Sequence, residues 1–267
     1  MDDLRKKAKE LLTENKVGVV IGYGQGSSGR ARAVFIKDPD KTDQLIFNDK
    51  CVQDLALYLS KAEVKKMGKM AIVATVPVMR AILVLASEHQ FVSDDLVVLG
   101  LSEEGKYVPL DDFKAVEEYL GALNIVLSEE DRAMIEKINA MSLEERWNFW
   151  QKEFSKCIKC YACRAACPLC YCHRCTVESN QPQWIPVAAD AMGNMEWHIM
   201  RAMHIAGRCI SCGYCAEACP MDIPLHLMTY TLIDEIKNDF GALAGMKADS
   251  EFALSHFKLD DKESFII

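Results

Sequence analysis

The feature that most constrains this chain is a cysteine motif that occurs twice. Each copy has the spacing C-x₂-C-x₂-C-x₃-C followed by proline, and the eight cysteines are Cys157, Cys160, Cys163 and Cys167, then Cys209, Cys212, Cys215 and Cys219. Three close thiolates with this spacing cap one iron–sulfur cubane, and in two-cluster ferredoxins the fourth thiolate reaches across to the other cluster. The sequence therefore predicts two [4Fe–4S] clusters.

The crossed pattern predicts which cysteines share a cluster. The first tetrad is Cys157, Cys160, Cys163 and Cys219, and the second tetrad is Cys209, Cys212, Cys215 and Cys167. A pair of zinc knuckles is the alternative, because zinc is also held by thiolates from C-x₂-C pairs. The third close cysteine and the trailing proline of each copy favour iron–sulfur clusters over zinc.

Four of the twelve cysteines remain outside these tetrads, and four thiolates are what one more cluster needs. They are Cys51, Cys170, Cys172 and Cys175. We therefore predict a third iron–sulfur cluster at the junction of two domains, where shared ligands would also fix the domains relative to each other. The alternatives are a buried, unligated Cys51, a ligand role for His173, a zinc site, and free thiols.

Basic residues surround the first motif. Between positions 156 and 174 there are four basic residues and no acidic one: Lys156, Lys159, Arg164 and Arg174. Positive charge near an anionic cluster raises its reduction potential. A solvated basic patch is the alternative interpretation.

Composition excludes several other classes of protein. The 267 residues are half hydrophobic, which is enough for a packed core, and the formal charge of −8 argues against a nucleic-acid surface. No stretch approaches the roughly 20 apolar residues that cross a bilayer, so we expect no direct membrane insertion. The charged segment MDDLRKKAKELL has no apolar signal-peptide core, which predicts a reducing cytoplasm.

The hydrophobic pattern divides the chain at about residue 140. Near-continuous apolar runs alternating with helical patterns predict an α/β domain over 1–140 with buried parallel strands. Its expected strands are 17–23, 30–36, 70–76 and 96–101, and its expected helical stretches are 3–15, 52–67 and 77–90. Over 141–240 we expect a mainly helical two-cluster domain with helices at 143–156, 185–206 and 224–237, and we treat 241–267 as a tail that could serve in docking. Ser142 with Glu145 predicts a capping box at the start of the first of these helices, and Trp147, Trp150 and Phe154 fall on one of its faces.

A glycine motif in the first domain is a poor match to a nucleotide site. Gly24, Gly26 and Gly29 spell G-x-G-x-x-G after an apolar strand. In a dinucleotide-binding fold these glycines open a helix. The next residues, RARAVFI, instead have the alternation of a strand, so we predict a glycine-rich turn between two strands.

The helical half resembles a known group of iron–sulfur proteins. The widely split motif pair, the segment RAMHIAGRCISCGYC and the segment CPMDIPLHLM are similar to the α-helical ferredoxins, over about residues 145–240. That group includes the small iron–sulfur subunit of heterodisulfide reductase and the iron–sulfur subunits of succinate dehydrogenase relatives. The resemblance implies two clusters carried between helices, and a role in passing electrons.

The order of elements over residues 15–105 resembles the N-terminal region of the β subunits of deazaflavin-reducing hydrogenases and related formate dehydrogenases. Those proteins carry flavin and iron–sulfur clusters, although TVPVMRA and LGLSEEG lack the cysteines that such relatives often have there. We therefore expect an electron-transfer subunit of a cytoplasmic, anaerobic oxidoreductase complex. Its partners would be a flavoprotein of the heterodisulfide-reductase large-subunit type and a hydrogenase or formate dehydrogenase. The alternative is a reductase with its own flavin in the N-terminal domain.

Overall fold

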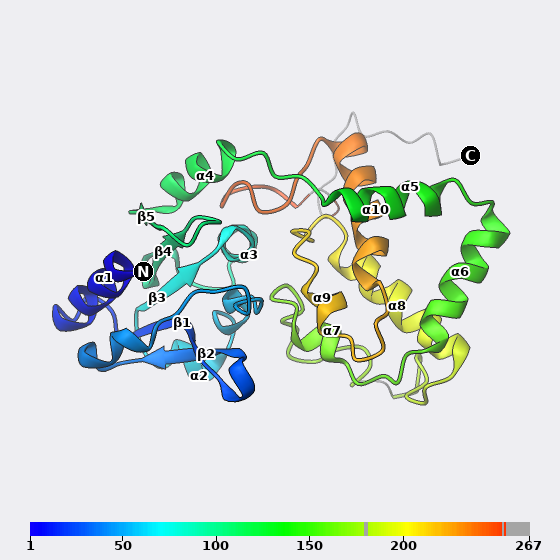
Figure 1. Ribbon diagram of the computed structural model, residues 1–267. Coiled ribbons are helices and arrows are strands. Elements are labelled where there is room, and N and C mark those ends of the chain that lie inside the picture. The colour runs from blue at the N-terminus through cyan, green and yellow to red at the C-terminus, as the bar shows by residue number, and fades with distance from the viewer. Residues whose placement is uncertain (179–180, 253, 255–267) are drawn as a thin grey trace. The chain divides into compact units, whose positions relative to one another are not determined.

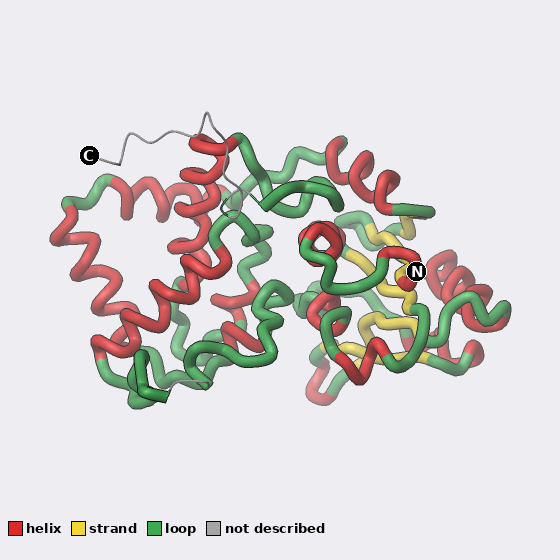
Figure 2. Tube along the Cα trace, turned by 180° about the vertical axis from the view of Figure 1, so that it is seen from behind, coloured by secondary structure: helices red, strands yellow, loops and turns green. Residues whose placement is uncertain are grey.

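The computed structural model describes residues 1–178, 181–252 and 254, and the chain divides into two compact units. The first unit comprises Met1–Asn124 together with Ala244–Ser250. The second comprises Ile125–Leu243 and the described residues after Ser250. Each unit has its own architecture (Figures 1 and 2). Of the described helices, none combines the length and the apolar composition that a membrane span requires.

The first unit is built on a mixed five-stranded sheet in the order β2-β1-β3-β4-β5 (Figure 1). The strands are β1 (Val19–Gln25), β2 (Ala31–Ile36), β3 (Met70–Ala74), β4 (Leu96–Leu101) and β5 (Tyr107–Leu110). The central strands β1, β3 and β4 are parallel, as their apolar runs predict, and the edge strands β2 and β5 pair antiparallel. The α/β region expected from the sequence is confirmed, with a mixed sheet.

Helices complete the first unit. They are α1 (Asp2–Thr13), the single-turn α2 (Ala62–Lys65), α3 (Val76–Ser87) and α4 (Phe113–Gly121). Helix α3 packs on β3 and β4, and its buried residues run without a break from Val78 to Ala86. Short 3-10 turns at Ser27–Gly29, Pro39–Gln44, Leu55–Tyr58 and Ser93–Asp95 fill the connections.

The glycine-rich stretch makes a tight hairpin, which confirms the predicted turn. After β1 the chain passes through one 3-10 turn and returns antiparallel as β2. A side chain at Gly24 would meet Val34 at 2.5 Å, and one at Gly26 would meet the carbonyl oxygen of Arg30 at 2.7 Å. These two glycines therefore serve close strand packing, and no helix follows them to receive a phosphate.

Some sequence-based expectations for the first half were wrong. The predicted helix over 52–67 is reduced to a 3-10 turn and the single-turn α2, because Asp54 caps a short turn and Gly68 follows with positive φ. Strand β5 and helix α4 were missed, since four residues of β5 give little alternation to detect. Helix α5 (Glu129–Asn139), which belongs to the second unit, was also missed.

The described residues of the second unit form helices joined by long loops, with no strand among them (Figure 2). Besides α5 they form α6 (Leu143–Ser155), α7 (Ala162–Ala165), α8 (Ala191–Ile205), α9 (Tyr214–Glu217) and α10 (Leu225–Phe240). Helix α6 packs on α8, and α10 packs on α5, α8 and α9. Helix α8 begins at Ala191 rather than at the expected residue 185, because Asp190 is its N-cap and accepts a bond from the amide of Gly193.

Helix α6 delivers the chain to the first cysteine motif. Ser142 and Glu145 form the predicted capping box, with both reciprocal hydrogen bonds present. Trp150 and Phe154 are buried one turn apart and face the core, whereas Trp147, which we expected on the same face, is 49% exposed. The apolar contact of α6 is thus limited to its second half, next to the cysteines.

Part of the C-terminal tail folds onto the first unit. The guanidinium of Arg80 in α3 donates to the carbonyl oxygen of Ala244 across 2.8 Å, and the amide of Ala248 donates to Glu117 in α4. Gly245 has φ +74° and lies so close to the backbone of Arg80 that a side chain would clash. The remainder of the predicted docking segment, at 253 and 255–267, lies outside the described residues.

Candidate iron–sulfur centre

The two cysteine motifs fold into loops with the same backbone conformation. Lys159 and Tyr161 flank the second cysteine of the first motif and have φ of 52° and 59°. Ser211 and Gly213 hold the corresponding positions of the second motif, with φ of 56° and 75°. Left-handed backbone costs a residue other than glycine roughly 1–2 kcal/mol. That three such residues adopt it indicates that each loop is shaped for a bound group.

Backbone amides point at sulfur in both loops. The amide of Lys159 donates to Sγ of Cys157 across 3.3 Å, and the amide of Ser211 makes the equivalent bond to the thiol of Cys209. The sulfur of Cys167 accepts from the amides of Leu169 and Cys170. Hydrogen bonds to ligand sulfurs are among the factors that set the potential of an iron–sulfur cluster. The donors that such a cluster needs are therefore already in place.

The thiols of the predicted first tetrad lie close enough to interact electrostatically. Cys157 interacts with Cys160 and Cys219, and Cys163 interacts with Cys157 and Cys219. Cys219 comes from the other motif, so this group contains the crossed partner that the spacing predicts. Cys163 is buried, Cys160 is exposed, and the other two are half-buried.

The second predicted tetrad gathers in the same way. Cys209 interacts with Cys167, and Cys215 interacts with Cys209 and Cys167. Cys212, like Cys209 and Cys215, lies close enough to Tyr230 to interact with its hydroxyl electrostatically. Here Cys167 is the residue contributed by the other motif.

The two groups of cysteines share one apolar core. The short helices α7 and α9, which carry the third cysteine of each motif, pack against each other. Cys163 is buried in a cluster that includes Trp150, Phe154, Met195, Ile223, Leu225, Leu227 and Tyr230, and Cys157, Cys215 and Cys219 pack against the same cluster. Bringing the motifs together therefore excludes water from the space between them.

Burial makes four of these eight thiols hard to ionise without a metal. It raises the pKa of Cys157, Cys163 and Cys209, and it raises that of Cys215 to about 12. Iron binds the thiolate, so loading the site releases these protons. Among the described residues, no three His, Cys, Asp or Glu side chains are arranged around a single metal ion. A cubane spreads its four ligands over four irons, so it does not require them to converge on one.

Cys167 differs from these four thiols. The thiol of Cys170 donates a hydrogen bond to it, and this bond, together with nearby Arg201 and two backbone amides, lowers the pKa of Cys167 below the ordinary thiol value in spite of its burial. The same bond raises the pKa of Cys170. Cys170, which we assigned to the third cluster, thus contacts a member of the second tetrad.

The other cysteines predicted for the third cluster are distributed over both units. Cys51 is buried in the first unit, where its sulfur accepts from the amide of Asn48 across 3.4 Å, and burial raises its pKa. In the second unit Cys172 is exposed, and Cys175 packs against Val177 and Trp197. The third cluster stays a prediction.

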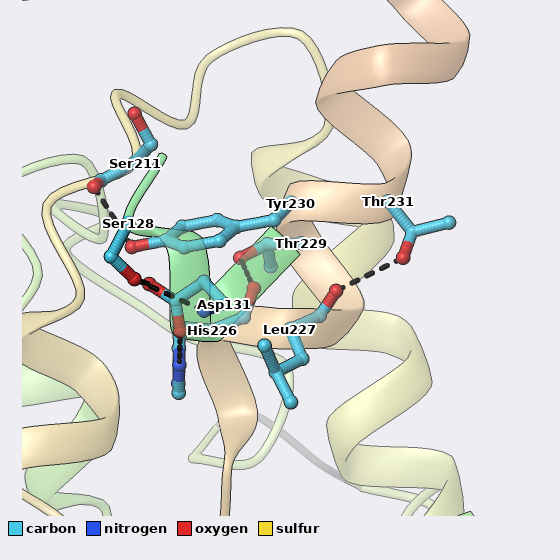
Figure 3. A network of polar contacts seen from close by, with 8 residues as sticks. All are labelled: Ser128, Asp131, Ser211, His226, Leu227, Thr229, Tyr230 and Thr231. Carbon is cyan, nitrogen blue, oxygen red and sulfur yellow. Dashed lines mark hydrogen bonds and ion pairs between the residues drawn. The ribbon is translucent and has the colours of Figure 1, made fainter. Parts of the chain in front are cut away.

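A network of hydrogen bonds connects the second motif to helix α10 (Figure 3). The hydroxyl of Tyr230 in α10 donates to the carbonyl oxygen of Ser211 across 2.8 Å. One turn earlier, Nε2 of His226 lies 2.8 Å from the carboxylate of Asp131, and the hydroxyl of Ser128 donates to the other oxygen of that carboxylate. Because the serine bonds the aspartate and not the histidine, this arrangement is not a nucleophilic triad. It ties α5 to α10.

The basic residues predicted near the first motif are mostly neutralised at the surface. Lys156 pairs with Glu153 at 2.7 Å, and Arg164 forms a two-pronged pair with Glu178 at 2.7 and 3.1 Å. Lys159 is buried, and its amine donates to the carbonyl oxygen of Pro186.

Sequence reasoning missed the cation that is buried among the cysteines. Arg201 lies in the middle of α8, is 5% exposed, and donates from Nη2 to the carbonyl oxygen of Cys163 across 3.1 Å. The signal available in the sequence was an arginine inside the otherwise apolar run WHIMRAMHI, since a fully buried arginine is rare unless it is paired.

An open cavity of about 580 Å³ in the first unit is lined by Lys65, Lys69, His89, Phe91 and Asp95 among others. It lies where β3 and β4 begin. Ligands of parallel α/β sheets bind outside the carboxyl ends of the strands. The position of this cavity therefore gives no support to a flavin or nucleotide site.

Comparison with known proteins identifies the class of the cysteine region. Residues 156–224 match the family model of the 4Fe-4S dicluster domain. The match starts one residue before Cys157 and ends at Pro224, so it contains both motifs. This is an iron–sulfur protein with a [4Fe–4S] dicluster domain in its helical unit.

Two curated relatives are subunits of redox enzymes. The F420-dependent formate dehydrogenase subunit beta of Methanocaldococcus jannaschii is 35% identical over 117 residues, which is 42% of this chain and 30% of that protein. The F420-dependent formate dehydrogenase 1 subunit beta of Methanococcus maripaludis is 30% identical over 115 residues, which is 42% of this chain and 29% of that protein. The chain thus spans less than a third of the length of either relative. The expected likeness of the N-terminal domain to hydrogenase β subunits stays unconfirmed.

Proposed function

We propose that this protein is an iron–sulfur electron-transfer subunit of an oxidoreductase complex. In this proposal it relays electrons between a flavoprotein of the heterodisulfide-reductase large-subunit type and another redox module, such as a hydrogenase or a formate dehydrogenase. The names of the relatives support the second kind of partner, because both are formate dehydrogenase subunits. The match to a 4Fe-4S dicluster domain supports a relay role, because such clusters carry electrons.

The observation that carries the proposal is the convergence of the two motifs. Cys163 interacts with Cys219, and Cys215 interacts with Cys167 and Cys163, so thiols of the two motifs lie near one another and border one apolar core. When bound, two cubanes would supply one-electron carriers whose potentials depend on their surroundings. The chain's own residues would hold the thiolates, donate amide hydrogen bonds to sulfur, and exclude water from between the two sites.

Metal content tests the proposal directly. Protein prepared under anaerobic conditions should be brown and contain about eight iron and eight sulfide atoms per chain, or about twelve of each if the third cluster is present. After reduction, its electron paramagnetic resonance spectrum should show two interacting clusters. A colourless preparation, or one containing zinc instead of iron, would refute the proposal.

Serine variants test the crossed ligand sets. We expect Cys219→Ser to remove the same spectral component as Cys157→Ser, and Cys167→Ser to remove the same component as Cys209→Ser. Each variant should contain about four iron atoms per chain fewer than the parent protein, because one cluster is lost. If Cys219→Ser instead matched Cys209→Ser, each motif would hold its own cluster and the crossed assignment would be wrong.

The third cluster and the flavin need their own measurements. Cys172→Ser changes an exposed thiol outside both tetrads, so a loss of about four iron atoms would support a third cluster and an unchanged count would reject it. Acid extraction of the same preparation should release no flavin. Stoichiometric flavin would favour the alternative, a reductase with its own site in the N-terminal unit.

A further inference from the structure

A buried arginine lies beside thiols of both tetrads. The guanidinium of Arg201 interacts electrostatically with Cys163 of the first tetrad and with Cys167 and Cys215 of the second, as well as with the neighbouring Cys170. Its Nη2 is fixed by the carbonyl oxygen of Cys163, and its Nε is buried without a hydrogen-bond partner among the described residues. A buried cation with an unsatisfied donor indicates a missing negative partner.

Among the described residues, no carboxylate forms a salt bridge with Arg201, whereas Arg164 pairs with Glu178. Burial opposes the charged form of Arg201, but the surrounding thiolates outweigh this effect and raise its pKa above the ordinary value. The guanidinium therefore stays charged at every pH at which the protein is folded.

A histidine on the same helix, one turn before Arg201, does not supply a positive charge. His198, one turn earlier, is buried against Phe154 with its ring centroid 4.4 Å away, and burial followed by the charges of Arg201 and Lys159 lowers its pKa to about 3. His198 is thus neutral. The positive charge at this position of α8 comes from Arg201.

We propose that Arg201 is a shared electrostatic partner of the two cysteine tetrads, which raises the reduction potential of both clusters at once. This inference rests on the proposed function, because it requires that the tetrads hold clusters. Reduction adds one negative charge to a cluster that is already anionic. A fixed cation in a site from which water is excluded stabilises the reduced form more than the oxidised form. It also offsets the repulsion between two neighbouring anionic groups.

Two substitutions separate charge from hydrogen bonding. Arg201→Gln removes the charge and keeps an amide donor. Arg201→Lys keeps the charge and loses the planar set of guanidinium hydrogen-bond donors. A nearby opposite charge shifts ionisation equilibria by about 1–3 pKa units, so its loss changes an equilibrium at least about tenfold. We expect the ratio of reduced to oxidised cluster in Arg201→Gln, at the parent's midpoint, to fall about tenfold, which corresponds to a shift of about −59 mV. Arg201→Lys should shift much less.

Arg146 provides the matched control. It is half-buried rather than buried, its Nη2 donates to the carbonyl oxygens of Asn139 and Met141, and its Nε has no partner among the described atoms. It lies at the start of α6, away from the cysteines. Arg146→Gln should leave both potentials unchanged, even if it lowers stability.

The measurement is an anaerobic redox titration followed by electron paramagnetic resonance, with iron and sulfide counted in each sample. Normal cluster content in Arg201→Gln with unchanged potentials would overturn the inference while leaving the proposed function intact. A parent protein without clusters would overturn the proposed function instead. If Arg201→Gln fails to assemble clusters, the inference predicts that Arg201→Lys restores assembly, and a Lys variant that fails equally would overturn it.

Discussion

The hydroxyl of Tyr230 and the carbonyl oxygen of Ser211 lie 2.8 Å apart, and this bond holds the second cysteine loop against helix α10 (Figure 3). Ser211 is left-handed and lies between Cys209 and Cys212. Burial, followed by the nearby cysteines, raises the pKa of Tyr230, so its hydroxyl remains a donor. The loop therefore depends on a contact that is distant in sequence.

Tyr230→Phe should loosen this loop. The variant leaves the Ser211 carbonyl without its partner, which costs about 1 kcal/mol, and it should release iron from the second tetrad faster in the presence of a chelator. The rate of bleaching in the visible spectrum measures the release. Thr231→Val is the control, because Thr231 bonds only within α10, to the carbonyl oxygen of Leu227. Equal bleaching rates in the two variants would contradict this role of Tyr230.

Asn194→Leu should destabilise the first motif. The fully buried amide of Asn194 donates to the carbonyl oxygens of Phe154 and Cys157, at 3.0 and 2.9 Å, where helix α6 ends. Leucine removes the side-chain donor from both carbonyls, although that of Phe154 still accepts from the amide of Cys157, and we expect the free energy of unfolding to fall by about 1–3 kcal/mol. Denaturant titration measures the change. Asn148→Leu, at an exposed site on α6, should change it by less than about 0.5 kcal/mol, and a similar loss in both variants would refute the prediction.

His198 should make the protein acid-sensitive. Its folded pKa is lowered to about 3 from 6.5, so as the pH falls the unfolded chain binds a proton before the folded chain does, and stability is lost. Between about pH 7.5 and 5.5 this contributes a loss of about 1.4 kcal/mol. We expect His198→Phe to lack this part of the loss, as measured by the difference between its unfolding curves and those of the parent. His204→Gln, at an exposed histidine, should follow the parent, and parallel curves for His198→Phe would contradict the prediction.

Ser142→Ala should weaken the helix that leads to the cysteines. The hydroxyl of Ser142 accepts from the amide of Glu145 and thereby caps α6. Its loss should lower the free energy of unfolding by about 1 kcal/mol, measured by thermal or denaturant unfolding. Ser155→Ala, which removes a hydroxyl at the other end of α6 that donates to Lys152, should have a smaller effect. The reverse order would show that the capping box does not stabilise this helix.

Local patterns predicted the parts of the fold that depend on neighbouring residues. The buried runs at 70–74 and 96–101 became parallel strands, and Ser142 with Glu145 became a capping box. The helix predicted over 52–67 was wrong because Asp54 caps a short 3-10 turn there and Gly68 has a positive φ, and both interrupt the helical pattern. A helical pattern is a weak preference that such local breakers override.

For the candidate site, the sequence alone predicted the donors, which are two matching sets of four cysteines, and the crossed grouping that their spacing implies. It did not determine the charges around them. Lys156 and Arg164 are near in sequence but pair with surface carboxylates, and only Lys159 of the predicted basic residues is buried next to a thiol, that of Cys157. Arg201 is distant in sequence and is buried beside thiols of both predicted tetrads. The spacing of the cysteines within a motif limits which thiols one short loop can offer to a cluster, because only a few residues separate them. Which charge lies next to them depends on how α8 packs, and only the tertiary structure decides that.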